Sequence, residues 1–250
     1  MTQPLRRFFV PPRSLRARNI TLGPELAHRL GRVLRLKRGD RVVLSEGGAR
    51  DYEVQLTGVS SYAITGVVLA EREAPPEPEV TLVLYQSLIR ANRFDLVLEK
   101  ATEIGVSRFV PVIAARSQVQ GNGEPAAARS ERWRRIVIEA AEQSGRGRPP
   151  RVEAPLPFEE AVGEARGLKL MPFEGERARS LGTYLRGLTR RPDVVSLYIG
   201  PEGGFETSEV ELARQSGAEI VSLGPRILRS ETAGIVASAL VMDALGQLDA

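Results

Sequence analysis

The 250-residue chain contains no cysteine and a single histidine, His28. The absence of cysteine excludes disulfide bonds, thiolate metal sites and cysteine nucleophiles. One histidine cannot supply a histidine-rich metal site, and it argues against a Ser-His-Asp triad. The sequence therefore gives no support for metal or cysteine chemistry.

Long hydrophobic runs are also missing. No apolar stretch approaches the ~20 residues that a membrane-spanning helix needs. The first ten residues are too short, and too interrupted by proline and arginine, for a signal peptide. No G-x-x-x-x-G-K-S/T phosphate-binding loop occurs. The expected location is the cytoplasm, and the length and ordinary composition, 42% hydrophobic, permit one or two domains.

Acidic residues are scarce in the first part of the chain. Between Met1 and Arg41, eleven Lys or Arg residues accompany only two acids, Glu25 and Asp40, a surplus of nine positive charges. Because the whole chain carries +4, the remainder carries a net charge of −5. A basic end on a mildly acidic body favours a polyanionic partner such as nucleic acid. A solvated charged face without a partner is the alternative.

Residues 1–73 are predicted to form a small β-rich module with one helix, followed by a proline-rich linker at residues 74–79. The helix is expected over Pro24–Arg35. Its apolar residues fall on one face: Leu26, Leu30, Val33 and Leu34. Three short antiparallel strands are expected, at residues 41–46, 51–58 and 63–70.

From Val80 onward strand-like and helix-like runs alternate, which predicts a mainly parallel α/β sheet with helices on both faces. The predicted strands are 80–87, 108–113, 168–173, 194–199 and 219–223. The predicted helices are 93–104, 126–145, 157–166, 178–188, 209–216 and 231–245. Ser208–Glu211 has a capping-box pattern. The last helix is apolar nearly all round, so it must be buried in a core or against another subunit.

Three of the predicted strands run into loops rich in glycine or proline that lead to helices. The loops are Met171–Gly175, Gly200–Phe205 and Leu223–Thr232. In a parallel sheet such loops lie together at the carboxyl edge, where α/β proteins bind ligands, and glycine lets a ligand approach the backbone closely. Ser230 is expected to cap the last helix. Ordinary turn chemistry in all three loops is the alternative.

One segment matches a loose dinucleotide-binding pattern. Gly121–Ala126 has the G-x-G-x-x-A form, with Glu139 and Glu142 near the distance expected of a ribose-binding acid. Residues 114–120 separate it from the preceding strand, so the tight strand-to-helix turn is missing, and Pro125 indicates a helix start instead. A nicotinamide-dependent oxidoreductase is therefore only a remote alternative.

Two C-terminal motifs carry a resemblance to a known family. They are Ile199–Phe205 (Ile-Gly-Pro-Glu-Gly-Gly-Phe) and Ser222–Ala233 (Ser-Leu-Gly-Pro-Arg-Ile-Leu-Arg-Ser-Glu-Thr-Ala). Further segments follow in the family's order: Arg6–Phe9, His28 with Val33–Arg35, Lys100–Val106, and Glu139–Ser144 with Arg146 and Pro149. With them the chain resembles, over essentially its whole length, the SPOUT-class methyltransferases of the RsmE type.

The resemblance implies an S-adenosylmethionine-dependent enzyme that methylates N3 of a specific uridine in 16S ribosomal RNA, on the assembled small subunit. It implies a PUA-like RNA-binding domain at residues 1–73, a linker at 74–79 and a SPOUT domain with a trefoil knot at 80–250. The active unit would be a homodimer that needs neither metal nor membrane. A non-catalytic RNA-binding or ribosome-assembly factor on the same scaffold is the second interpretation.

The resemblance also assigns site residues. Cofactor contacts are expected from the three loops and the helix start: Met171, Pro172, Glu174, Ile199, Gly200, Pro201, Gly203, Leu223, Gly224, Arg226, Ile227, Leu228, Thr232 and Ala233. Two of these, Ile227 and Leu228, would pack on the adenine faces. RNA contacts are expected from the basic part of the chain: Arg6, Arg7, His28, Arg32 and Arg35.

Methyl transfer to uridine N3 requires that N3 lose its proton. Glu202 and Glu231 are the candidate bases, and Arg226 or Arg229 could instead stabilise the developing uridine anion. We favour arginine-assisted electrostatics and predict catalytic roles for Arg229, Glu231 and Glu202. The related branch that methylates ribose has an asparagine in the run equivalent to Ile227–Glu231. Its absence here favours a base as the target.

Overall fold

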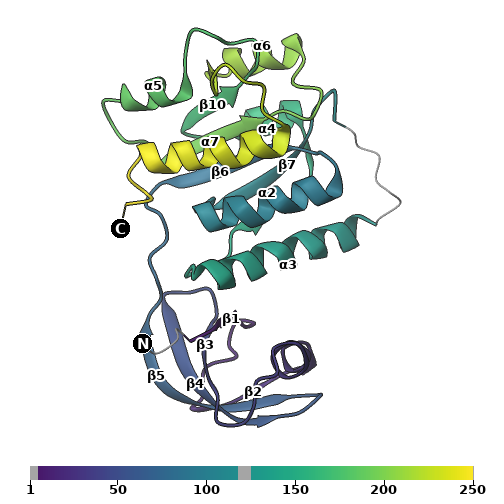
Figure 1. Cartoon of the computed structure of the whole chain (residues 1–250), viewed down its shortest axis with the longest axis vertical. Helices are drawn as coiled ribbons and strands as arrows, with labels where there is room; N and C mark the ends of the chain where they lie inside the picture. Colours follow the sequence, from purple (N-terminus) through teal and green to yellow (C-terminus); the bar gives the residue numbers. More distant parts are fainter. Residues whose placement is uncertain (1–4, 118–124, 250) are drawn as a thin grey trace. The chain divides into compact units, whose positions relative to one another are not determined.

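The computed structural model describes residues 5–117 and 125–249 (Figure 1). They form two compact units, each with its own sheet. The N-terminal unit comprises Met1–Glu77 and Ala141–Pro149, and the C-terminal unit comprises Pro78–Ala140 and Pro150–Ala250. No helix in the described ranges is both long enough and apolar enough to cross a lipid bilayer.

The N-terminal unit is built on a five-stranded sheet. Its strands are β1 (Arg7–Phe9), β2 (Asn19–Leu22), β3 (Arg41–Ser45), β4 (Arg50–Val59) and β5 (Ile64–Glu73). Across the sheet they follow the order β1-β3-β4-β5-β2, with β1 parallel to β3 and the other neighbours antiparallel. The three predicted strands are confirmed as β3, β4 and β5. Neither β1 nor β2 is predicted from the sequence. Strand β1 has only three residues, and the alternation of exposed and buried residues in β2 extends over only four.

The single helix predicted over Pro24–Arg35 is wrong in its second half. A short α-helix, α1 (Pro24–Ala27), continues as a π-helix, η1 (His28–Val33), which closes with a hydrogen bond between residues five apart. The wider turn of a π-helix moves later side chains out of the 3.6-residue period. Val33, predicted on the apolar face, is consequently 61% exposed, whereas Leu30 is fully buried.

The end of helix α3 (Ala126–Ser144) packs within the N-terminal unit. The Glu142 carboxylate accepts a hydrogen bond from the backbone N of Phe9 at 2.8 Å and forms an ion pair with Arg29. The guanidinium of Arg29 also lies 5.3 Å from the centre of the Phe8 ring. These contacts explain why residues 141–149 belong with the first sheet although they follow the linker in sequence.

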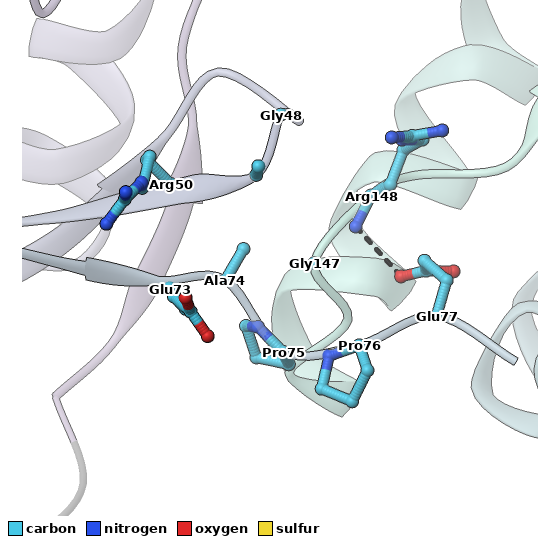
Figure 2. A pocket seen from close by; sticks show the side chains of 10 residues that line it. Gly48, Arg50, Glu73, Ala74, Pro75, Pro76, Glu77, Gly147 and Arg148 are labelled. Carbon is cyan, nitrogen blue, oxygen red and sulfur yellow. Dashed lines mark hydrogen bonds between the residues drawn. The ribbon is translucent and has the colours of Figure 1, made fainter.

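A pocket of about 420 Å³ lies in the same unit, between the β3–β4 turn, the linker and the loop after α3 (Figure 2). The backbone N of Arg148 donates to the Glu77 carboxylate at 2.9 Å, and Arg148 Nε donates to the Gly47 carbonyl at 3.2 Å. Arg146 forms an ion pair with the same glutamate. The end of the predicted linker is therefore fixed by hydrogen bonds and an ion pair.

The C-terminal unit is a parallel α/β structure. Its strands are β6 (Thr81–Ser87), β7 (Arg108–Ile113), β8 (Arg151–Val152), β9 (Leu156–Pro157), β10 (Leu168–Pro172), β11 (Val194–Ile199) and β12 (Glu219–Val221). The order is β12-β10-β11-β6-β7-β8, β9 also pairs with β7, and all these pairs are parallel. The predicted parallel sheet is confirmed, since the five predicted strands match β6, β7, β10, β11 and β12 within two residues.

Helices cover both faces of this sheet (Figure 1). Besides α3 they are α2 (Ala91–Ile104), α4 (Phe158–Glu164), α5 (Leu181–Arg186), α6 (Thr207–Gln215) and α7 (Ser230–Ala244). Helices α2, α3, α5 and α7 share one core with Leu82 and Leu84, whereas α4 and α6 share another with Val83 and Tyr85. Alternate residues of β6 therefore face opposite layers, as expected of a strand buried on both sides.

Helix α7 is the predicted apolar helix, and it is buried on one side only. The buried side consists mainly of small and aliphatic residues: Ser230, Glu231, Gly234, Ala237, Ser238, Val241 and Met242. The opposite side carries Leu240, which is 39% exposed, beside half-buried Ile235 and Val236. An apolar strip on this helix therefore remains accessible in the single chain.

Two helix starts differ from the predicted ones. The N-cap of α6 is Glu206, which forms a capping box with Glu209 in place of the predicted Ser208 and Glu211. A glutamate carboxylate accepts the backbone hydrogen bond that a serine hydroxyl would accept. The N-cap of α7 is Arg229, so Ser230 is not the cap and its hydroxyl can contact other parts of the unit.

Candidate active site

Strands β10, β11 and β12 end next to one another. Strand β10 lies between the other two and is parallel to both, with Leu170 in register with Leu197 of β11 and with Glu219 of β12. Their carboxyl ends therefore lie at one edge of the sheet. The three loops singled out in the sequence leave this edge together, as predicted.

The loop after β12 presents an apolar side chain and unused backbone donors. Ile227 is 88% exposed. Among the residues that the structure describes, the backbone N–H groups of Arg226, Ile227 and Leu228 donate no hydrogen bond. Gly224 has φ of +110°, and its N donates to Ser222 Oγ at 3.1 Å, which fixes the turn. A large apolar side chain in water beside free donors is typical of a ligand-binding loop.

The loops after β10 and β11 approach each other closely. Gly204 has φ of +68°, and a Cβ on it would collide with the carboxylate of Glu174 from the β10 loop. The β10 loop is held by Glu176, whose Oε1 accepts hydrogen bonds from the backbone N of Ala178 at 2.6 Å and of Arg179 at 3.1 Å. These hydrogen bonds to the ionised form hold the pKa of the Glu176 carboxyl below its usual range. The two loops are therefore shaped before any ligand binds.

The predicted cofactor residues divide by burial. Three have buried side chains, so they can offer a ligand only backbone groups: Met171, Ile199 and Pro201. Five are half-buried: Pro172, Gly200, Leu223, Leu228 and Ala233. Six are exposed: Glu174, Gly203, Gly224, Arg226, Ile227 and Thr232. Most of the exposed positions lie in the loops at the sheet edge, where a ligand can reach them.

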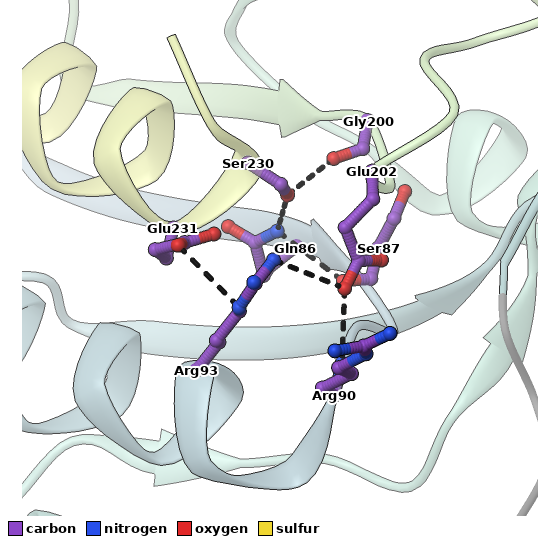
Figure 3. Close-up of polar contacts among 8 residues, drawn as sticks. All are labelled: Gln86, Ser87, Arg90, Arg93, Gly200, Glu202, Ser230 and Glu231. Carbon is purple, nitrogen blue, oxygen red and sulfur yellow. Dashed lines mark hydrogen bonds and ion pairs between the residues drawn. The ribbon is translucent and has the colours of Figure 1, made fainter.

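Buried polar residues join the end of β6 to these loops (Figure 3). Gln86 Nε2 donates to Ser230 Oγ at 2.9 Å, and the Ser230 hydroxyl donates to the Gly200 carbonyl. Gly234 follows in α7, and a Cβ on it would collide with Gln86 Oε1. The fully buried glutamine therefore ties together strand β6, the β11 loop and the first turn of α7.

Arg93 of α2 lies between the two predicted carboxylates (Figure 3). Its Nη1 is 3.7 Å from Glu202 Oε1, and its Nε is 3.6 Å from Glu231 Oε1. The Glu202 and Glu231 side chains are 19% and 10% exposed. The backbone N of Arg90 donates to Glu202 Oε1 at 3.3 Å. One guanidinium thus contacts two carboxylates, one from the β11 loop and one from the first turn of α7.

Four buried polar atoms of this cluster have no hydrogen-bond partner within the described ranges. They are Gln86 Oε1, Ser87 Oγ, Glu202 Oε2 and Glu231 Oε2. Each of them can accept a hydrogen bond. Because buried polar groups are nearly always hydrogen-bonded, these acceptors call for donors from bound water or from a ligand.

The two candidate arginines lie in the segment that leads into α7. Arg229 is exposed and is the N-cap of α7, two residues before Glu231, and Arg226 is exposed in the preceding loop. In the part of the chain that the structure describes, neither guanidinium forms an ion pair with a carboxylate. Both positive charges are therefore available to an anionic ligand.

The predicted RNA residues lie in the N-terminal unit, and four of the five are exposed: Arg6, His28, Arg32 and Arg35. Arg7 differs because it is buried and forms a bidentate pair with Asp51, including a 3.1 Å hydrogen bond from Nη1 to Oδ1. Its guanidinium is engaged within the fold and does not face solvent.

The dinucleotide pattern offers little in the structure. Gly121–Glu124 lie outside the described residues, and α3 begins directly after Pro125. Glu142, one of the two acids, is engaged with Phe9 and Arg29. Within the described residues, no group of three or more His, Asp or Glu could hold a metal ion.

Comparison with known proteins identifies the family. The model of a family described as "RNA methyltransferase domain" matches residues 76–242. The "Ribosomal RNA small subunit methyltransferase E" of Synechocystis is 36% identical over 239 residues, which cover 94% of this chain and 76% of the relative. The chain belongs to the ribosomal RNA small subunit methyltransferase E family. The resemblance read from the sequence motifs is thereby confirmed.

Two further relatives of this methyltransferase extend the comparison. The protein of the same name from Bacillus subtilis is 29% identical over 218 residues and 85% of each chain. The crystal structure of the Neisseria gonorrhoeae protein of that name, bound to S-adenosyl methionine, is 30% identical, with a TM-score of 0.85 over 96% of this chain and 98% of its own. The similarity therefore includes the sequences of both units.

Sequence reasoning missed four residues of the polar cluster at the candidate site: Gln86, Ser87, Arg90 and Arg93. The only signal is that the buried strand β6 ends in two polar residues, followed by Arg-x-x-Arg at a helix start. Polar residues are common at such boundaries, so the pattern alone is uninformative. It becomes informative only because the fold brings Glu202 and Glu231 against it.

Proposed function

We propose that this methyltransferase transfers a methyl group from S-adenosylmethionine to N3 of a specific uridine in 16S ribosomal RNA, on the assembled small subunit. The observation that carries the proposal is the apolar, donor-rich loop around Ile227, which leads into the helix that carries Glu231, one of the two glutamates with an unpartnered carboxylate oxygen. The loop suits a cofactor with an adenine ring. The carboxylates suit a substrate nitrogen that must lose a proton.

The loop residues fit the adenine part of the cofactor. The free N–H groups of Arg226, Ile227 and Leu228 would donate to the ring nitrogens, which are acceptors. The side chains of Ile227 and Leu228 would cover the ring faces and leave water on binding. Glu174 would accept from ribose hydroxyls, and backbone groups of the buried strand ends would complete the contacts. When bound, S-adenosylmethionine supplies the methyl group on a positively charged sulfonium.

The catalytic residues handle the proton and the charge of the uridine. One carboxylate of the Glu202–Glu231 pair accepts the N3 proton on its unpartnered oxygen. A positioned base contributes typically ~10²–10⁴-fold in rate. Arg229 stabilises the negative charge that spreads from N3 to the uridine carbonyl oxygens as the proton leaves. The sequence leaves two alternatives, a carboxylate base and an arginine that stabilises the uridine anion. Both of them have a role in the proposed mechanism.

The N-terminal unit is proposed to be PUA-like and to hold the RNA through its phosphates. Its exposed cations, Arg6, Arg32 and Arg35, with His28, supply contacts that do not depend on base identity. The turn between β4 and β5 also presents Tyr62, which is 79% exposed. An unpaired base can stack on such an aromatic side chain.

The C-terminal unit is proposed to carry the trefoil knot of SPOUT enzymes and to act as a homodimer in the cytoplasm. In support of the knot, the chain leaves β12 at the edge of the sheet and returns in α7, which contacts β11, β6 and α2. In support of the dimer, the strip of α7 around Leu240 is accessible and apolar, so a second copy would cover it. RNA held by one subunit would then meet cofactor held by the other.

Mass spectrometry of ribosomal RNA nucleosides tests the proposal. A strain that lacks this gene should lose one N3-methyluridine from its small subunits, and the wild-type chain should restore it. Arg229→Ala should lower methyl transfer by about 10²–10³-fold, the effect of removing one charge-stabilising donor, with unchanged cofactor affinity. Undiminished turnover in that variant would remove Arg229 from the mechanism.

The non-catalytic assembly factor is separated by calorimetry. The enzyme should bind S-adenosylmethionine with one site per chain, whereas a pure RNA-binding factor need not bind it. A chain that binds small subunits but neither binds the cofactor nor restores the methylated nucleoside would establish that alternative.

A further inference from the structure

We infer that Arg93 is a positioning residue of the methyl-transfer site, which holds Glu202 and Glu231 by one oxygen each and leaves the other oxygen of each for the uridine. The inference rests on the proposed function and deepens it. It adds a residue of the α2 segment to a site that the sequence motifs place in the C-terminal loops and at the start of the last helix.

The geometry assigns the two oxygens of each glutamate to different tasks. Both contacts of Arg93 are made to Oε1 atoms, at 3.7 Å from Glu202 and 3.6 Å from Glu231. The backbone N of Arg90 also binds Glu202 Oε1. Both Oε2 atoms are buried and have no partner among the described residues. The Oε1 atoms are therefore engaged, and the Oε2 atoms are the acceptors of the pair that remain for a donor.

The charges lead to the same role. Two carboxylates that share a site repel each other, and a single positive charge between them compensates one negative charge. Arginine keeps its charge at every physiological pH, and its planar group offers different nitrogens to different partners. Within the group formed by Arg93, Glu202 and Glu231, one carboxylate charge is left uncompensated, and the departing N3 proton would neutralise it.

Lysine cannot replace this arrangement fully. Its ammonium is a compact point charge, whereas Arg93 uses Nε toward Glu231 and Nη1 toward Glu202. A lysine at position 93 would supply the charge and hold one carboxylate well. We therefore expect Arg93→Lys to retain part of the activity and Arg93→Ala to lose most of it.

The experiment uses small ribosomal subunits from a strain that lacks the enzyme, with S-adenosylmethionine and the full-length chain. Arg93→Ala should lower kcat by about 10²-fold, the lower bound for loss of a positioned base. The KM for subunits and the calorimetric affinity for S-adenosylmethionine should stay unchanged. Added guanidinium ion should restore part of the activity of Arg93→Ala. The control Arg134→Ala removes an arginine on α3 that is 65% exposed, and it should behave as the wild type.

A double-mutant cycle separates positioning from a structural role. In a Glu202→Gln/Glu231→Gln background, Arg93→Ala should cause no further loss, because the groups that it positions are already disabled. Equal losses in both backgrounds, or a loss of cofactor affinity together with kcat, would overturn the inference. So would full activity of Arg93→Ala. If the wild-type chain itself transfers no methyl group, the proposed function fails instead. Arg93→Lys provides the same test if Arg93→Ala does not fold.

Discussion

Two arginines of this protein form ion pairs with carboxylates in contrasting ways. In the N-terminal unit, Arg7 and Asp51 form a bidentate pair in which both carboxylate oxygens are bonded, with side-chain exposures of 8% and 1%. In the C-terminal unit, Arg93 reaches Glu202 and Glu231 through one oxygen each and leaves two buried acceptors unpartnered. The first arrangement is closed, and the second is open.

The difference is between an ion pair that serves the fold alone and one that, as we propose, serves a ligand site. In a closed pair the two desolvated groups satisfy each other, so no buried acceptor remains for a ligand. An open pair keeps buried acceptors unsatisfied, which costs stability unless a ligand supplies donors. Sequence alone cannot separate the two, because both appear as arginines and acids far apart in the chain. The number of unpartnered oxygens distinguishes them.

The largest expected effect comes from breaking the closed pair. Arg7→Met leaves the Asp51 carboxylate buried without its partner, which should lower the free energy of unfolding by about 3–5 kcal/mol. Chemical denaturation measures this, and Arg7→Met/Asp51→Leu should recover most of the loss. The folded Arg7→Met protein should bind RNA normally. A stable variant with weakened RNA binding would instead make Arg7 the RNA contact that the sequence predicted.

Replacing a carboxylate of the open pair by an amide should lower activity and leave stability nearly unchanged. Glu231→Gln or Glu202→Gln should lower single-turnover methyl transfer by about 10²-fold, because an amide cannot take up the N3 proton. Thermal unfolding should change little, since each amide keeps the shape of the carboxylate. Glu99→Gln, on the exposed side of α2, is the matched control. If both variants transfer methyl groups at the wild-type rate, the base lies elsewhere.

Shortening the exposed Ile227 side chain should change only the affinity for the cofactor. Ile227→Ala should weaken S-adenosylmethionine binding by roughly tenfold, because burying an aliphatic side chain contributes ~1.5–3 kcal/mol and alanine retains part of it. Calorimetry checks this, and stability should not change because Ile227 is 88% exposed. Leu248→Ala, at 49% exposure outside the loops, is the control. Equal affinities would remove Ile227 from the cofactor site.

The smallest effect is expected at the exposed cations. Arg32→Ala and Arg35→Ala should each reduce the slope of log affinity against log salt for small subunits by about 1, with modest losses at physiological salt. This contrasts with Arg7, whose replacement should leave the slope unchanged. Filter binding at several salt concentrations measures the slope. Unchanged slopes for both variants would place the RNA on another surface.

Most of the C-terminal fold could be predicted because its signals are local. Apolar runs such as 194–199 mark strands buried on both faces, and glycine or proline after them marks the loops. The three loops could be placed together without coordinates, since parallel strands end at the same edge. Helix boundaries were less predictable. Serine is a preferred N-cap residue, but α7 already begins at Ser230 and its N-cap is Arg229.

What could not be predicted depends on distant residues or unusual helix geometry. Arg93 gains its partners from positions 109 and 138 residues further along the chain, which only the tertiary topology brings near. Arg7 reads as a basic surface residue until Asp51 appears opposite it. Val33 left the apolar face because η1 is a π-helix, and a 3.6-residue period cannot reveal that change.

Gly234 of α7 is a position where the packing around Gln86 favours glycine. It carries no functional group, yet a single methyl group there would meet Gln86 Oε1. Gln86 holds Ser230, which in turn holds the carbonyl of Gly200. A substitution at Gly234 would therefore push the Gln86 amide aside and disturb its hydrogen bond to Ser230. A position without a functional group is thus linked, through Gln86 and Ser230, to the loop after β11.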